Sequence, residues 1–583
     1  MKPTTSSLNG GILVGEVLAS QGVRFIYTLC GGHISPILVG AEAQGIRIID
    51  VRHEATTVFA ADATARLTGV PGVAAVTAGP GVTNTLTALK NAQMAQSPVV
   101  LIGGAAATLL KGRGALQDID QMALVKPLVK WAKAITKVRD IVPTLEKAFR
   151  ICQEGIPGPV FVEIPLDLLY PQELVKEQMR AEVGKVKGIA GRAIRYYVNN
   201  HLNRTFAKAW ERRATAPEPI ALSMPSDKQI NTVADKLKNA QRPLILLGSQ
   251  AVVDTKHVAA LQEAVVQLGI PTYLSGMARG LLGHHPLHMR HHRTKALREA
   301  DVILRVGVPC DFRLGYGRSI PQSTVHIGIN RSKEDLNKNR RPTIGVQCDA
   351  GGFLRELVPA LQKEPKPTWR KWHESLSKRD VERNSEIDRQ ASHETEHVNP
   401  VWLCQQIEGM VDYDSVIIGD GGDFVGTASY IIRPRTPLSW LDPGAFGTLG
   451  SGGGFALAAK LCRPSAETWL LYGDGSAGYS LAEFDTYARH NIPVIAVVGN
   501  DGSWEQIARE QVEILGTPLG TVLERTDYHQ VAVGYGGVGL CIDRPESIEA
   551  TLIQAKEIAN QGKPVLVNVL IGKTDFRKGS ISI

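Results

Sequence analysis

Residues 469–502 read WLLYGDGSAGYSLAEFDTYARHNIPVIAVVGNDG, and the pattern of this stretch is the clearest indication of the fold class. It opens with an apolar run that ends at Asp474 and closes with a second apolar run that ends at Asn500-Asp501. Between the two runs, apolar residues recur at helical spacing as far as Pro493. The pattern therefore predicts a strand, a helix and a second strand. Such a crossover returns the chain in the same direction, so the carboxyl ends of both strands share one edge of a parallel sheet.

Two carboxylates are thereby expected at the edge of the sheet where ligands of open α/β folds bind. Without a counter-charge, Asp474 and Asp501 would repel each other, and one would tend to take up a proton. A hard divalent cation removes this conflict, because it takes oxygen ligands from both. Glycines on either side of Asp474 let the backbone approach a phosphate. Each Asp-Gly step alone is more often a plain turn, but the pair at crossover spacing predicts Mg²⁺ bridging to a diphosphate.

Three long segments of the chain alternate short apolar strands with helices, which indicates an α/β fold of three doubly wound parallel-sheet domains. Two connectors separate them, one basic and one charged, helix-prone and expected to be exposed. The expected boundaries are 1–185, a basic linker at 186–225, 226–362, a charged linker at 363–397, and 398–583.

Composition limits the class of protein. A chain of 583 residues is too long for one core, and 43% hydrophobic with 21% charged residues is ordinary for a globular protein. No apolar run approaches the roughly 20 residues that span a bilayer, and the first residues lack a signal-peptide core. The seven cysteines are scattered and never form a CxxC pair. We therefore expect no membrane partner and a cytoplasmic location.

The net charge of +8 is modest, and the charges are well mixed, so no nucleic-acid footprint is expected. One basic concentration lies at 185–213. Its simplest interpretation is a solvated linker face, with binding of a phosphate-bearing small molecule as the alternative.

The Gly-Asp-Gly triplet followed by the Asn-Asp pair resembles the thiamine diphosphate motif. Over nearly its whole length the chain resembles the acetolactate synthase and 2-hydroxyacyl-CoA lyase branch of the thiamine diphosphate enzymes. This resemblance implies a pyrimidine domain, a middle domain and a diphosphate domain, in that order. It also implies that Mg²⁺ is held by the side chains of Asp474 and Asp501 and by the carbonyl of Ser503. Relatives carry a second Asn where this chain has Asp501, which leaves Asn500 open as the alternative ligand.

The stretch VRHEATTVFAADATARLTG at 51–69 presents Glu54 at a strand-to-helix transition. Alone, Arg52-His53-Glu54 is more often a solvated surface cluster. In the family, the same pattern carries the catalytic Glu, which contacts the pyrimidine ring and promotes loss of the thiazolium C2 proton. The resemblance therefore implies that Glu54 is both catalytic and cofactor-binding. It also implies that each site draws on two subunits, so that a homodimer or a homotetramer is expected.

Further site residues follow from weaker likeness to the family's loops. Gln117 in GALQDIDQ is expected over the reactive centre, although a plain exposed loop competes with this reading. His33 is a candidate acid-base group because of its near-neutral pKa, although lone histidines are more often structural. TAGPGVTN at 77–84 resembles a cofactor-side loop, and Leu449 takes the place of the residue that bends the cofactor. The expected cofactor contacts are Glu54, Gly422, Asp423, Gly447, Leu449, Gly473, Asp474, Gly475, Ser476 and Asp501.

Within the branch, stretches such as FIYTLCGGHISP and WLDPGAFGTLG resemble the lyase group. That likeness implies reversible cleavage of a 2-hydroxyacyl-CoA to formyl-CoA and an aldehyde or ketone, the reverse direction being an acyloin condensation. Arginines of the middle segment are candidates for the CoA phosphates, namely Arg279, Arg290, Arg293 and Arg313. Animal members carry an N-terminal membrane anchor that we do not find here.

Three alternatives stay open. One is an acetolactate synthase-type carboligase that uses pyruvate and holds FAD in the middle domain. Another is an oxalyl-CoA-type decarboxylase. The third is a non-catalytic paralogue that binds thiamine diphosphate, against which Glu54 and Asp474 argue.

Overall fold

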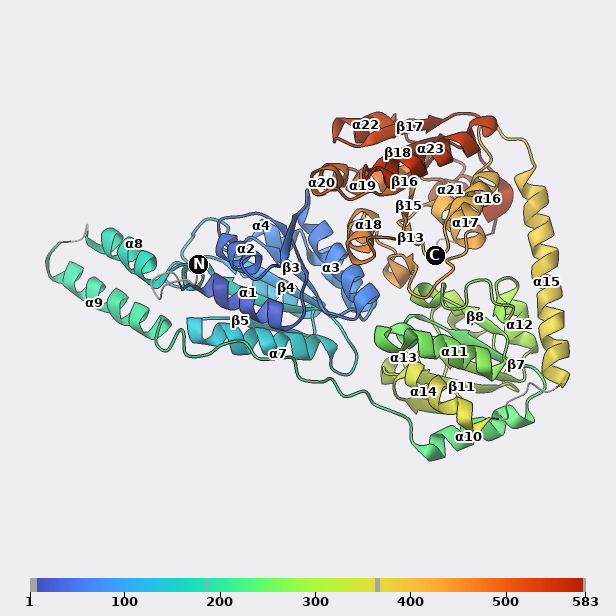
Figure 1. Cartoon of the computed structure of the whole chain (residues 1–583), viewed down its shortest axis with the longest axis horizontal. Helices are drawn as coiled ribbons and strands as arrows, with labels where there is room; N and C mark the ends of the chain where they lie inside the picture. Colours follow the sequence, from blue (N-terminus) through green and yellow to red (C-terminus); the bar gives the residue numbers. More distant parts are fainter. Residues whose placement is uncertain (1–7, 185–186, 362–366, 580–583) are drawn as a thin grey trace. The chain divides into compact units, whose positions relative to one another are not determined.

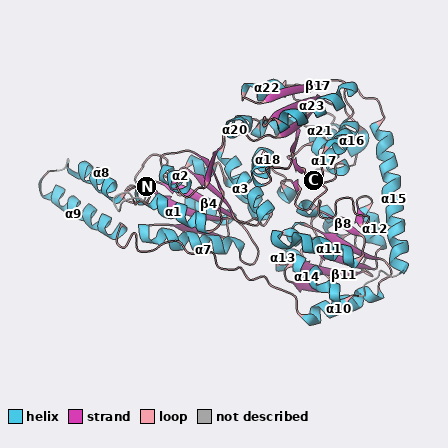
Figure 2. Cartoon of the chain, in the orientation of Figure 1, coloured by secondary structure: helices cyan, strands magenta, loops and turns pink. Residues whose placement is uncertain are grey.

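A computed structural model describes residues 8–184, 187–361 and 367–579. In this part of the chain, three six-stranded sheets are flanked by helices, and every strand pair is parallel (Figures 1 and 2). The predicted α/β class with three parallel-sheet domains is confirmed. The chain divides into two compact units, residues 1–65 with 70–220 and residues 66–69 with 221–583. The first unit holds one sheet and the second unit holds two.

The first sheet has the order β2-β1-β3-β4-β6-β5. Its central strands β3, β4 and β6 are buried at every position, as expected for parallel strands covered on both faces. The strands are β1 (Phe25–Leu29), β2 (Arg47–Asp50), β3 (Gly72–Val76), β4 (Val99–Ala105), β5 (Trp131–Ala134) and β6 (Val160–Pro165). The helices are α1 (Gly10–Ser20), α2 (Ser35–Glu42), α3 (Glu54–Thr68), α4 (Pro80–Thr83), α5 (Leu86–Met94), α6 (Gln121–Val125), α7 (Ile141–Gln153), α8 (Gln172–Gly184) and α9 (Gly188–Thr205).

The second sheet has the order β12-β11-β10-β7-β8-β9. Its strands are β7 (Pro243–Leu247), β8 (Thr272–Leu274), β9 (His288–Met289), β10 (Val302–Val306), β11 (Val325–Asn330) and β12 (Ile344–Gln347). Its helices are α10 (Asp227–Asn239), α11 (Val258–Leu268), α12 (Arg293–Glu299), α13 (Lys333–Asn337) and α14 (Ala350–Leu357).

The third sheet has the order β14-β13-β15-β16-β18-β17. Its strands are β13 (Val416–Gly419), β14 (Trp440–Leu441), β15 (Thr468–Gly473), β16 (Ile495–Asn500), β17 (Val538–Ile542) and β18 (Val565–Leu570). Its helices are α16 (Pro400–Met410), α17 (Asp423–Ile431), α18 (Ser451–Cys462), α19 (Asp474–Ser480), α20 (Glu483–His490), α21 (Glu505–Leu515), α22 (Tyr528–Gly534) and α23 (Ile548–Asn560).

The predicted crossover at 469–502 is confirmed, because β15 and β16 pair in parallel with Gly473 opposite Gly499. The single predicted helix is two helices, α19 and α20. The second ends where Asn491 takes a left-handed conformation, just before Pro493. Both strands thus end at the same edge of the sheet.

Both connectors contain a helix in their described parts, as the helix-prone composition of the charged one indicates. The charged segment predicted as an exposed linker at 363–397 forms α15 (Pro367–Ala391), although residues 362–366 lie outside the described part. The expectation of exposure is wrong for one side of α15: the indole Nε1 atoms of Trp369 and Trp372 donate to the carbonyls of Ala240 and Pro243, at 3.0 and 3.1 Å. In the basic segment, α9 buries Val198 and Leu202. Lys185 lies outside the described residues.

A search of the described helices found none with the length and apolar character needed to cross a membrane. All seven cysteines are free thiols.

Candidate active site

The strand order of the third sheet reverses at β13. The next strand in the sequence, β14, lies on one side of β13, and β15 lies on the other. Two glycine turns meet there. Gly422 precedes α17 with a φ of 106°, a conformation open to glycine. A Cβ atom on Gly422 would lie 3.2 Å from the Cα of Gly473, so the two backbones pass in near contact. Open α/β sheets bind ligands at such a switch point. Here the contact between the two backbones leaves little space for a side chain at position 422.

Asp474 begins α19 directly after β15 and holds the neighbouring turn. Its Oδ1 accepts a hydrogen bond from its neighbour Gly475, at 2.8 Å, and its Oδ2 accepts from the backbone N–H groups of Gly502 and Ser503, at 2.8 and 3.2 Å. Burial raises the pKa of Asp474. Hydrogen bonds therefore join the turn after β15 to the turn after β16, the two turns that were predicted to converge.

Asn500 and Asp501, the two alternatives for the side-chain ligand, differ in surroundings. Asn500 is fully buried, and its Nδ2 donates to Thr526 O at 3.0 Å and to Asn568 Oδ1 at 3.2 Å. Asp501 lines a small pocket, and its buried Oδ1 has no hydrogen-bond partner in the described part of the chain. Burial, reinforced by nearby Asp474, raises the pKa of Asp501 to about 8. Asn500 Oδ1 is likewise buried without a hydrogen-bond partner among the described residues, but of the two residues only Asp501 lines the pocket, which favours Asp501 as the cation ligand.

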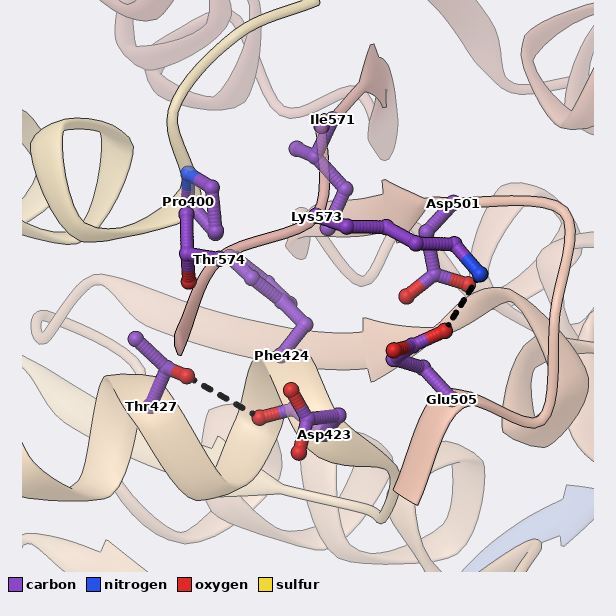
Figure 3. Close-up of a pocket in the computed structure, with 10 residues that line it drawn as sticks. Pro400, Asp423, Phe424, Thr427, Asp501, Glu505, Ile571, Lys573 and Thr574 are labelled. Carbon is purple, nitrogen blue, oxygen red and sulfur yellow. Dashed lines mark hydrogen bonds and ion pairs between the residues drawn. The ribbon is translucent and has the colours of Figure 1, made fainter. Parts of the chain in front are cut away.

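The pocket is lined by residues from four parts of the third domain (Figure 3). Asp423 and Thr427 come from α17, Asp501 follows β16 and Glu505 begins α21. Pro400 begins α16, and residues 571–574 follow β18. Figure 3 shows Lys573 reaching Glu505 alongside Asp501, with Nζ 2.8 Å from Glu505 Oε2. Among the described residues, no group of three or more His, Cys, Asp or Glu side chains is arranged to hold a metal.

The remaining predicted cofactor residues lie around the same turns. Leu449 packs on the glycine loop, because a Cβ on Gly421 would lie 2.2 Å from its Cδ2. Ser476 Oγ donates to the carbonyls of Gly421 and Gly473, each at 3.0 Å. Gly447 is an exposed turn glycine with a φ of 65°.

Sequence reasoning missed Asp420, the first acid of the GDGGD stretch. It is buried, and its carboxylate accepts hydrogen bonds from the N–H groups of Gly450 and Gly452, at 3.0 and 2.7 Å. Burial raises its pKa to about 7. Asp420 therefore anchors the start of α18 next to Leu449, and only its place in an Asp-Gly-Gly-Asp stretch signalled it.

In the first unit, Glu54 begins α3 and is 8% exposed. Its Oε2 accepts a hydrogen bond from Asn84 Nδ2 at 2.9 Å. Asn84 was not singled out from the sequence, although it closes the glycine-rich stretch at 77–84.

His33 and Gln117 are brought together by Thr77, which the sequence also did not single out. The hydroxyl of Thr77 lies 3.1 Å from His33 Nδ1 and donates to Gln117 Oε1 at 3.4 Å. Gln117 has a φ of 62°, and its carbonyl occupies the space that a Cβ on Gly79 would need. Burial lowers the pKa of His33. The groups come from the turns after β1, β3 and β4, while Glu54 follows β2, so all lie at the carboxyl edge of one sheet.

The four arginines predicted for CoA phosphates all have protein partners. Arg279 lies 4.1 Å from the ring centroid of Trp440 and donates to Ser429 O. Arg290 donates to the carbonyls of Tyr430 and Ile431. Arg293 donates to Arg313 O at 2.6 Å, and Arg313 pairs with Asp311 at 2.5 Å. These side chains help to hold the second unit together.

Comparison with known proteins agrees with the fold. The N-terminal, central and C-terminal domains of thiamine pyrophosphate enzymes match residues 8–124, 230–357 and 420–569. The chain belongs to the thiamine pyrophosphate enzyme family, whose cofactor is thiamine diphosphate.

Among its relatives, 2-hydroxyacyl-CoA lyase 2 of Danio rerio is 53% identical, covering 99% of this chain and 94% of the relative. The human protein of the same name is 51% identical over 99% of this chain and 92% of its own. A probable acetolactate synthase of Mycobacterium bovis is 34% identical over 97% of this chain and 96% of its own.

Proposed function

We propose that this protein is a thiamine diphosphate- and Mg²⁺-dependent lyase that cleaves 2-hydroxyacyl-CoA reversibly to formyl-CoA and an aldehyde or ketone. The carrying observation is the identity of 53% and 51%, over nearly the whole chain, to relatives named 2-hydroxyacyl-CoA lyase 2. The acetolactate synthase relative, at 34%, is more distant. This difference favours the lyase over a carboligase that uses pyruvate.

The residues at the edge of the third sheet fit the cofactor. Gly422 and Gly473 carry no side chains, so neither residue shields the backbone N–H groups at the first turn of α17 from a diphosphate. The orphaned oxygen of Asp501, with Asp474 and the carbonyl of Ser503, supplies the hard oxygen ligands that Mg²⁺ prefers. When bound, thiamine diphosphate supplies a thiazolium ring that stabilises the carbanion left by breaking a carbon–carbon bond.

The first unit supplies the groups that move protons. Asn84 orients the carboxyl group of Glu54 through Oε2, so that the group can hold and release a proton against the pyrimidine ring. His33 has a lowered pKa and stays neutral near pH 7, so it can accept the proton of the substrate hydroxyl group. Gln117, fixed through Thr77, offers a second polar contact to the acyl group.

We further propose an acyl-CoA substrate, a homodimer as the minimal assembly and a cytoplasmic location. The homodimer is supported by membership of a family in which the Glu-bearing and diphosphate-binding domains that share one cofactor come from different subunits. The free and scattered cysteines support a reducing compartment.

Initial rates with a 2-hydroxyacyl-CoA, with pyruvate and with oxalyl-CoA separate the candidate functions. Each substrate is supplied with and without thiamine diphosphate and Mg²⁺. We expect formyl-CoA from the 2-hydroxyacyl-CoA only when both are present. Acetolactate from pyruvate, without formyl-CoA from several 2-hydroxyacyl-CoAs, would establish the carboligase instead.

A further inference from the structure

Three acidic side chains line the pocket beside the predicted metal turn: Asp423, Asp501 and Glu505 (Figure 3). Only Asp501 is needed as a cation ligand, and the other two add negative charge at close range. Buried like charges compete for any cation and for protons unless each has a partner. The cations that pair with Asp423 and Glu505 therefore decide which acid is left to meet the metal.

Asp423 is held by two arginines. Arg509 Nη2 lies 2.7 Å from Asp423 Oδ2, and Arg577 Nε lies 3.8 Å from Asp423 Oδ1. The side chains of Asp423, Arg509 and Arg577 are 15%, 16% and 14% exposed, so solvent screens these pairs little. Arg509 Nη1 also donates to the carbonyl of Arg577 at 3.1 Å, which ties the two arginines together.

Glu505 and Asp501 differ in their pairing. Lys573 Nζ lies 2.8 Å from Glu505 Oε2. Asp501 Oδ1 and Glu505 Oε2 are both buried without a hydrogen-bond partner in the described ranges, but Asp501 forms no ion pair there. The arginines thus pair with Asp423, and Lys573 pairs with Glu505. Asp501 remains the acid that is available to a metal ion.

Two of the three cations come from one segment, residues 573–577, which follows β18 far from α17 in sequence. Arg577 packs over the ring of Tyr430 at 5.6 Å, and Phe576 meets the same ring edge-on at 6.0 Å. A Cβ on Gly426 would lie 2.8 Å from Arg577 Cζ, so the guanidinium fills the space that this glycine leaves open. The segment is therefore seated against α17.

We propose that Lys573 and Arg577 are positioning residues of the cofactor site. Because they neutralise Glu505 and Asp423, Asp501 is left as the acid that would coordinate Mg²⁺ when thiamine diphosphate binds. The inference rests on the proposed cofactor and its metal, and it is independent of the acyl-CoA substrate.

The test measures the dissociation constant of thiamine diphosphate at saturating Mg²⁺ by calorimetry, without substrate. Arg577→Met is expected to weaken binding about tenfold, the loss typical when an outer partner of a metal ligand is removed. Arg577→Lys keeps the charge and should restore most of the affinity. Gly426→Ala should mimic Arg577→Met, because the added methyl group displaces the guanidinium. Arg544→Met is the matched control, since Arg544 is 78% exposed and pairs with Asp543.

A second arm separates charge neutralisation from a merely structural role. If Arg577 acts by neutralising Asp423, then Asp423→Asn should make Arg577 dispensable, and the double variant should bind as Asp423→Asn alone. Unchanged affinity in Arg577→Met, or a double variant as weak as Arg577→Met, would overturn the inference. A wild-type protein that binds no thiamine diphosphate would overturn the proposed function as well. One that binds it but releases no formyl-CoA would overturn only the lyase assignment.

Discussion

At the scale of single residues, Asp501 adds a second carboxylate beside Asp474. The adjacent Asn500 is anchored to Thr526 and Asn568, so its side chain already has a role within the domain. Both residues keep a side-chain oxygen without a hydrogen-bond partner in the described part of the chain, but of the two only Asp501 lines the pocket. The sequence left the choice between the two open, and their contacts favour Asp501 as the ligand.

We predict that Asp501→Asn retains thiamine diphosphate and Mg²⁺ nearly as well as the wild type, because an amide oxygen replaces the carboxylate oxygen. Asp501→Ala removes the ligand and should weaken binding by at least about tenfold. Calorimetric titration measures both, and Asp543→Ala, an exposed acid of the same domain, is the control. Wild-type affinity in Asp501→Ala would show that another group holds the metal.

The sequence singles out Glu54 and Asp474 because each begins a helix after an apolar strand in a distinctive local pattern. Their partners could not. Asn84 and Thr77 belong to an ordinary glycine-rich turn, and their roles arise only when the turns after β1, β2, β3 and β4 converge. The pairing of Asp423 with Arg577 likewise joins segments far apart in the chain.

At the scale of elements, short apolar runs predicted the parallel strands well, because buried strands carry their signal in consecutive residues. The connector at 363–397 shows the limit of this reasoning. Its composition is highly charged, yet α15 buries the apolar side chains of Trp369, Trp372, Leu376, Ile387 and Ala391. The average composition of a segment does not show that a few large apolar side chains at helical spacing can form one buried face.

The middle domain carries an acid-sensitive pair in its second sheet. His326 on β11 is 1% exposed, and its Nε2 accepts a hydrogen bond from Arg305 Nε at 3.0 Å. Burial, together with Arg305 and Arg340, lowers its pKa from 6.5 to about 3. At pH values between about 3 and 6.5, His326 is protonated in the unfolded chain and neutral in the folded chain. The free energy of unfolding therefore falls on acidification, by at most about 1.4 kcal/mol per pH unit.

We predict that His326→Gln, which keeps an acceptor but does not titrate, loses this sensitivity. Between pH 7 and pH 5, wild type should lose roughly 2 kcal/mol more unfolding free energy than the variant. Urea unfolding at both pH values provides the comparison. Equal losses in the two proteins would show that His326 is protonated in the folded state.

At the scale of the whole molecule, the predicted site residues fall in two compact units, with Glu54 in one and Asp474 in the other. Our proposed assembly shares each site between subunits. We predict that an inactive Glu54→Gln protein and an inactive Asp474→Ala protein regain activity when unfolded and refolded together. Random pairing should give about a quarter of the wild-type rate, because half of the dimers are mixed and each holds one intact site.

The same mixture gives no recovery if each site is built within one subunit. Refolding of each variant alone is the control, and its activity should stay at background. Size-exclusion chromatography of the mixture shows whether dimers have formed.

The central claim is that Glu54 acts with bound thiamine diphosphate to cleave a 2-hydroxyacyl-CoA. The most direct measurement is the rate of formyl-CoA release by wild type and by Glu54→Gln, both saturated with thiamine diphosphate and Mg²⁺. We predict release by the wild type and a loss of at least about 100-fold in the variant, the lower range of effects for a positioned acid-base group. Full release by Glu54→Gln, or none by the loaded wild type, would contradict the account.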